Sequence, residues 1–106
     1  MFQEYTEASY SAKIYIAGPI DLIHQSCRKF VNKTRICVNV TPNHYIFPYG
    51  EQPGAIIELI QYPKYPAQNE DIFLTAIELG YAICEECHQG SFTITDRNIS
   101  KTFDRR

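Results

Sequence analysis

The chain has 106 residues, of which 44% are hydrophobic and 21% are charged, and its formal net charge is −2. This balance excludes a disordered chain, and the weak negative charge argues against a binder of nucleic-acid polymers, which needs a basic face. The length fits a single α+β domain over 1–106. Because Met1–Ala12 holds no apolar leader and no apolar run could span a bilayer, we expect a cytoplasmic protein without membrane contact.

The chain opens with a predicted strand followed by a predicted helix. Lys13–Ala17 is a short β-prone run that ends at Gly18 and Pro19. From Pro19 to Lys33, apolar residues recur at spacings of three and four, which is typical of an amphipathic helix packed on a sheet.

Two further strands are predicted to form a hairpin. Ile36–Val40 and His44–Phe47 are β-prone, and we expect Thr41–Asn43 to form a kink or bulge between them. Pro48–Gly54 is rich in turn-forming residues, so it should reverse the chain in a longish loop. Ala55–Tyr62 then returns as an antiparallel strand.

The second half predicts a helix, a strand and a tail. After a loop at Pro63–Gln68, Asn69 is a suitable N-cap for a helix that Gly90 closes as C-cap. Ser91–Thr95 alternates as a last strand, and Ile99–Arg106 is a short tail. The order β-α-β-β-α-β favours an antiparallel or mixed sheet with two helices on one face.

The cysteines and the missing catalytic motifs argue against cofactor chemistry. Cys84 and Cys87 with His88 match the haem-attachment string C-x-x-C-H, but both thiols fall on the apolar stripe of the predicted helix. They are therefore interpreted as core residues, and we predict no metal site and no cofactor. Since no nucleophile motif or phosphate loop occurs, the sequence also predicts that the chain is not an enzyme.

Basic residues gather in two places that could hold an anionic ligand. The first is the predicted helix, with Arg28, Lys29, Lys33 and Arg35, where His24 lies one turn before Arg28. The second lies near the C-terminus, where Phe92, Arg97, Asn98, Lys101, Phe103, Arg105 and Arg106 combine basic and aromatic groups. Arginine binds phosphate through its planar fork and aromatic rings stack on bases, so both sets suit a nucleotide. The alternative is a solvated helix face and a solvated tail.

Lys13–Pro19 resembles the opening strand of nucleoside deoxyribosyltransferases. In that family the strand leads into a parallel nucleotide-binding fold. The resemblance covers these seven residues, and two successive strands follow the first helix here instead of alternating strands and helices. It keeps a nucleoside- or nucleotide-processing enzyme as an alternative.

A longer set of strings resembles the first-described family of phage anti-Thoeris sponge proteins. These strings cover most of 12–99: Lys13–Pro19, Cys27–Phe30, Cys37–Pro42, Tyr45–Glu51, Glu58–Pro63 and Gln89–Ile94. The resemblance implies a homo-oligomer, such as a hexamer, that captures cyclic ADP-ribose isomers in the bacterial host cytoplasm without degrading them. In some members it implies capture of the cyclic di- or trinucleotides of CBASS defence as well.

The resemblance also implies where ligands would bind. His24, Gln25 and Arg28 would suit a site shared between symmetry-related helices, and Arg97, Asn98, Lys101 and Arg105 with Phe92 would suit a second pocket. Three hypotheses therefore stand: a sponge for cyclic nucleotide signals, an enzyme acting on nucleosides or nucleotides, and a structural module that binds another protein.

Overall fold

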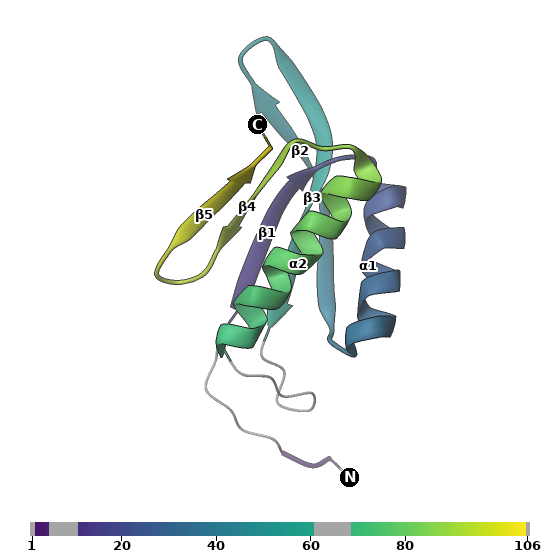
Figure 1. The fold of residues 1–106 in the computed structure, drawn as a ribbon, viewed down its shortest axis with the longest axis vertical. Helices are drawn as coiled ribbons and strands as arrows, with labels where there is room; N and C mark the ends of the chain where they lie inside the picture. The colour runs from purple at the N-terminus through teal and green to yellow at the C-terminus, as the bar shows by residue number, and fades with distance from the viewer. Residues whose placement is uncertain (1, 5–10, 61–68, 106) are drawn as a thin grey trace.

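The computed structural model describes residues 2–4, 11–60 and 69–105, and within them an antiparallel sheet carries two helices on one face (Figure 1). The strand order is β2-β3-β1-β4-β5. The elements in chain order are β1 (Ser11–Ala17), α1 (Ile20–Thr34), β2 (Val38–Phe47), β3 (Gly50–Ile60), α2 (Asn69–Cys87), β4 (Ser91–Thr95) and β5 (Ser100–Asp104). The predicted α+β class and the order of its first six elements are confirmed.

The core lies between the sheet and the two helices. In β1, every second residue is buried, so Ala12, Ile14 and Ile16 face the helices while the residues between them face away. The helices supply the other side of this core with Ile23, Cys27, Phe30, Ile72, Ala76, Leu79, Ile83, Cys84 and Cys87. The apolar spacing that predicted the helices therefore marks their buried faces.

The predicted C-terminal tail is wrong in part, because 100–104 form β5 and pair antiparallel with β4. The turn between them is held by Asp96, whose side-chain carboxylate accepts hydrogen bonds from the backbone N–H groups of Asn98 and Ile99 at 2.8 Å each. Phe103 stacks on Phe92 with ring centroids 5.0 Å apart. This stacking packs β5 against the core and stabilises its pairing with β4, so the residues predicted as a tail form a strand.

The predicted bulge in β2 and the predicted long loop after it are also wrong. The pairing between β2 and β3 runs without interruption through Thr41, Pro42 and Asn43. Proline fits there because β2 is an edge strand, where its missing N–H can face away from the ladder. The chain reverses in a tight turn at Pro48 and Tyr49, and β3 starts at once at Gly50.

Both helices end at non-glycine residues in the left-handed region. Arg35 (φ 66°) ends α1, and its N–H donates to the carbonyl of Val31 at 2.8 Å. His88 (φ 56°) follows α2, and the N–H of Gln89 donates to the carbonyl of Cys84 at 3.0 Å. The expected cap at Gly90 is therefore wrong, because the helix has already ended at Cys87.

Two expectations depend on which residues the structure describes. The predicted loop Pro63–Gln68 lies outside the described residues. Within 2–4, 11–60 and 69–105, no helix is long and apolar enough to cross a membrane.

Candidate functional site

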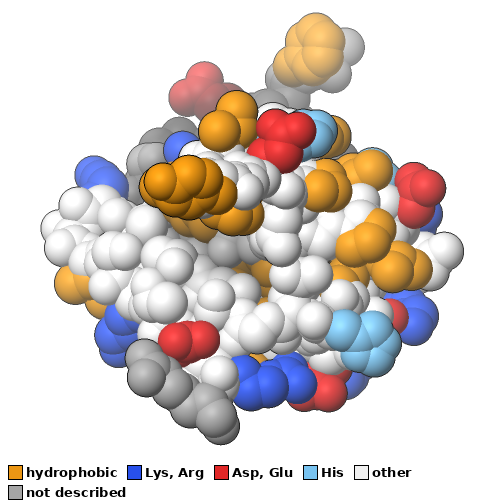
Figure 2. Space-filling view, turned by 90° about the horizontal axis from the view of Figure 1, so that it is seen from above, with side chains coloured by type: hydrophobic (Ala, Val, Ile, Leu, Met, Phe, Trp, Pro, Cys, Tyr) orange, Lys and Arg blue, Asp and Glu red, His pale blue; other side chains and the backbone are white. Residues whose placement is uncertain are grey.

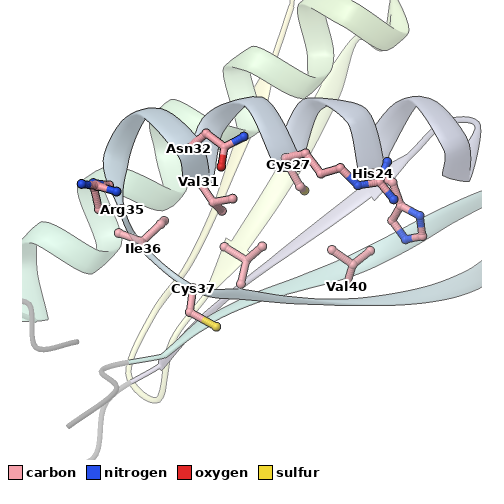
Figure 3. Close-up of a pocket in the computed structure, with 10 residues that line it drawn as sticks. His24, Cys27, Val31, Asn32, Arg35, Ile36, Cys37 and Val40 are labelled. Carbon is pink, nitrogen blue, oxygen red and sulfur yellow. The ribbon is translucent and has the colours of Figure 1, made fainter. Parts of the chain in front are cut away.

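A groove of about 800 Å³ runs between α1 and the edge strand β2 (Figure 3). Its lining comes from one helix, the link after it and the start of the strand. The lining residues are His24, Cys27, Arg28, Val31, Asn32, Arg35, Ile36, Cys37, Val38 and Val40. Because β2 is the last strand of the sheet on this side, no further strand closes the groove.

The groove exists because α1 overhangs the edge of the sheet. Ile23, Cys27 and Phe30 form the buried face of α1, so the neighbouring row of the helix faces outward past β2. Arg35 then ends the helix in the left-handed conformation and returns the chain along the helix as β2. The groove lies between the helix, the link and the strand.

The floor of the groove is apolar. Val31, Ile36, Val38 and Val40 are half-buried, and the last three pack against the core. Figure 3 shows the side chains of Val31 and Val40 pointing into the space between helix and strand. Such a floor can take a flat, weakly polar group such as a nucleobase.

The rim of the groove is cationic. Arg28 and Arg35 are exposed, His24 is half-buried, and Asn32 adds an amide. Figure 3 shows His24 and Arg35 toward opposite ends of the groove. Among the described residues that line it, none is a carboxylate. Two guanidinium forks above an apolar floor can bind an anion such as phosphate or carboxylate, and the imidazole can accept or donate a proton.

The buried thiol in the groove is not a nucleophile near neutral pH. Burial raises the pKa of Cys27 to about 11, and the neighbouring Cys87 adds to the shift. Since the thiolate is the reactive form, Cys27 behaves as a small apolar side chain. Cys37, in the same groove, is exposed.

The cysteines of the C-x-x-C-H string lie in the core. Cys84 and Cys87 are buried in the core, and burial raises the pKa of each thiol. Among the residues that the structure describes, no group of three or more His, Cys, Asp or Glu side chains could hold a metal ion. Their interpretation as core cysteines agrees with this placement.

The structure brings together part of the predicted helix site. His24 and Arg28 both line the groove, and Gln25 is exposed on α1 but is not among the lining residues. Arg35 also lines the groove, although the sequence predicts it only as part of a basic cluster. Val38 and Val40 on the strand side are not among the predicted site residues, although their alternation with exposed Asn39 is the signal for them.

The predicted C-terminal site is not brought together. Phe92 is buried under α2, and Arg97 and Asn98 lie at the turn between β4 and β5, while Arg105 follows the far end of β5 (Figure 1). The Arg105 guanidinium binds the Glu85 carboxylate at 3.1 Å. Lys101 Nζ lies 5.8 Å from the ring centroid of Phe73 on α2. These side chains do not surround a common space.

Comparison with known proteins gives a fold but no family. No protein-family model matches the chain, and no curated protein is similar to it. Two solved structures of a phage SAM lyase are similar to it in fold, each with a TM-score of 0.69. The complex with S-methyl-5'-thioadenosine is 13% identical, with 98% of this chain and 95% of the other covered. The apo state is 15% identical, with 100% and 98% covered.

These neighbours correct the prediction that the chain is not an enzyme. Both share its fold over nearly the whole length, and both are structures of an enzyme, a lyase. The missing nucleophile motif is therefore no argument against catalysis, because an enzyme can act by binding and orienting its substrate. The antiparallel sheet also differs from the parallel fold that the deoxyribosyltransferase resemblance implied. The expected likeness to phage proteins holds at the level of the fold.

Proposed function

We propose that this chain is a phage-encoded protein of the host cytoplasm and that it binds a phosphate-bearing adenosine nucleotide in the groove between α1 and β2. The observation that carries the proposal is the combination of an apolar floor with Arg28, Arg35 and His24, while no carboxylate occurs in the part of the lining that the structure describes. The groove volume of about 800 Å³ falls within the range of small-ligand pockets, about 300–1,000 Å³.

The two halves of a nucleotide match the two parts of the groove. The base can lie on Val31, Val38 and Val40, where burial of its faces is favourable. The phosphate can reach Arg28 or Arg35, whose planar forks form paired hydrogen bonds to phosphate oxygens. Such charge-assisted bonds are stronger than bonds between neutral groups, so the arginines would dominate affinity.

Within this class, the resemblance to the sponge family favours cyclic ADP-ribose isomers and cyclic di- or trinucleotides. These compounds combine bases with two or more phosphates, and the two arginines could each hold one. Removal of such a signal, by binding or by conversion, would block a bacterial defence that depends on it.

S-Adenosylmethionine is the second candidate, because the fold is shared with a phage SAM lyase and one of those structures holds S-methyl-5'-thioadenosine. Its adenosine would suit the same apolar floor. It carries a sulfonium and an ammonium against a single carboxylate, however, so its net charge is positive, and no carboxylate among the described lining residues would offset the repulsion from Arg28 and Arg35. The charge of the groove therefore ranks it below an anionic nucleotide.

Calorimetric titration followed by chromatography of the released ligand tests the proposal. The panel is cyclic ADP-ribose isomers, cyclic di- and trinucleotides, S-adenosylmethionine and S-methyl-5'-thioadenosine. We expect the tightest binding from a phosphate-bearing compound, and chromatography then reports whether that compound has been converted. Preferred binding or cleavage of S-adenosylmethionine would support the second candidate, and no binding by any compound would overturn the proposal.

A further inference from the structure

The hairpin of β2 and β3 extends beyond the rest of the sheet (Figure 1). The last residue of β1, Ala17, pairs with Gly54, and the hairpin continues for four more pairs, from His44↔Pro53 to Phe47↔Gly50. This outer part is a ribbon of two strands. A two-stranded ribbon is marginally stable by itself in water, so further contacts must stabilise it.

Two aromatic side chains pack over glycines and stabilise the ribbon. The ring of Tyr45 covers Gly54, and its hydroxyl donates to the carbonyl of Ala55 at 2.9 Å. The ring of Phe47 covers Gly50 next to the turn. A Cβ at Gly54 would overlap the Tyr45 ring and the backbone of β1 at Ile16 and Ala17, so this position needs glycine, whereas a Cβ at Gly50 would push the Phe47 ring aside. The ribbon is therefore a preformed projection.

The tip of this ribbon, Ile46, Phe47 and Tyr49, is apolar and exposed. Ile46 is 79% exposed, Phe47 is 47% exposed and Tyr49 is fully exposed. Figure 2 looks onto the molecule from the hairpin end and shows several apolar side chains at the surface of this face, with charged side chains between them. Tyr49 also has φ 66°, a conformation that costs a non-glycine residue roughly 1 kcal/mol. Exposed apolar groups on a strained turn are typical of a contact surface.

We infer that this tip docks into the α1/β2 groove of a second copy of the chain. Tip and groove are complementary in shape and polarity, because the tip is convex and apolar and the groove has an apolar floor. They are also complementary in charge, because Glu51 beside the tip is an exposed carboxylate and Arg28 and Arg35 lie at the groove rim. The tip cannot reach its own groove. From Val40 to Phe47 the strand extends by about 23 Å at roughly 3.3 Å per residue.

Two copies can exchange tips around a two-fold axis. Each copy then gives one tip and receives one, so two identical contacts form, and the second forms at a high effective concentration. The inference does not require the proposed nucleotide, and because the tip and a base would use the same apolar floor, the two would compete for the groove. It gives the groove a covering element that the single chain lacks.

Disulfide cross-linking tests the contact without any nucleotide. Ile46→Cys places a thiol on the tip, and Cys37 already lies exposed in the groove. A second acceptor is made on the helix side with Asn32→Cys in a Cys37→Ser background. Under a mild oxidant we expect I46C to form a linked dimer through at least one of these acceptors. The matched control, I46C/C37S without N32C, should stay monomeric on a non-reducing gel.

Two results would overturn the inference. One is the absence of a linked dimer with either acceptor. The other is a linked dimer in I46C/C37S, which would mean that tips meet tips. Nucleotide titration of the tip variant Ile46→Ser/Tyr49→Ser, in which no tip fills the groove, keeps the proposals apart, since a free groove that binds no nucleotide refutes the proposed function alone.

Sedimentation of unlinked protein gives a second measurement. We expect wild-type protein to associate with rising concentration and the double variant I46S/Y49S to stay monomeric. Leu74→Ser is the matched control, because it removes an apolar side chain that is 57% exposed on α2. If L74S dissociates the protein and I46S/Y49S does not, the contact lies on α2 and the inference is wrong.

Discussion

Gly80 on α2 lies directly against the aromatic ring of Phe92 on β4, and a Cβ at Gly80 would overlap three carbon atoms of that ring. Glycine inside a helix usually costs about 1 kcal/mol relative to alanine. Here it lets the helix approach the sheet closely, and the rings of Phe103 and Tyr81 pack around Phe92 with centroids 5.0 Å and 5.3 Å away.

Gly80→Ala is therefore expected to destabilise the protein although alanine is the better helix former. Overpacking of this kind costs typically 1–3 kcal/mol, which exceeds the gain in helix propensity. Urea unfolding should show the loss as a lower midpoint. Gly90→Ala is the matched control, because a Cβ there meets nothing within 4 Å. Equal stability of G80A and wild type would mean that Phe92 can move aside.

The sequence predicted the parts of the fold that depend on local pattern. Helix spacing and strand alternation fixed α1, α2, β1 and β4, since their buried faces repeat along the chain. It failed at β5, because 100–104 are mostly exposed and form a strand only through pairing with β4 and the Phe103 contact. It also failed at the Pro48 turn, where pairing across β2 and β3 outweighs the turn-forming residues after it.

The site could be predicted only from its helix side. His24 and Arg28 share a helix face, which spacing reveals. The strand side depends on β2 being the edge of the sheet, and strand order is a tertiary property. The C-terminal residues were grouped because they are near in sequence, yet β5 separates Arg97 from Arg105 by its own length.

Arg28→Ala should weaken binding of the nucleotide that calorimetry selects. Loss of a charge-assisted hydrogen bond of about 1.5–3 kcal/mol corresponds to about a tenfold to hundredfold rise in Kd. Lys33→Ala is the matched control, since it removes a positive charge from the same helix outside the groove. If both variants lose affinity equally, the effect is one of net charge and Arg28 does not contact the ligand.

Thiol reagents should find one fast cysteine. Cys37 is exposed, whereas burial raises the pKa of Cys27 to about 11 and also raises those of Cys84 and Cys87. At pH 8 about one Cys27 side chain in a thousand is then thiolate. We expect a single rapid modification in native protein that disappears in C37S, and slow labelling of the others that accelerates in urea. Rapid labelling of C37S would show that the core opens easily.

The pair of Lys29 and Glu86 should make stability depend on pH. The Lys29 ammonium donates a hydrogen bond of 2.8 Å to the Glu86 carboxylate and lowers its pKa. The folded state therefore binds this proton less readily than the unfolded chain. Its contribution is present above the ordinary glutamate pKa of about 4.3 and is lost as pH falls through the lower folded pKa.

Glu86→Gln should accordingly reduce the free energy of unfolding at pH 7 by at most about 1 kcal/mol, the size usual for exposed pairs, and have little effect in strong acid. Urea unfolding at both pH values measures the difference. In a Lys29→Met background the substitution should have no effect at either pH. An equal loss in that background would assign the effect to Glu86 alone.

Arg35→Gly should separate stability from binding. Arg35 ends α1 with φ 66°, where glycine avoids the cost of about 1 kcal/mol that a side chain brings, although glycine also makes the unfolded chain more flexible. We expect stability that is unchanged or up to about 1 kcal/mol higher, because the backbone bond to Val31 stays. Nucleotide affinity should fall about tenfold or more, because a guanidinium is lost from the groove rim.

Arg35→Lys keeps the charge and the strained backbone, so its stability should match wild type. A less stable R35G with unaltered affinity would show that Arg35 supports the helix end by packing and takes no part in binding.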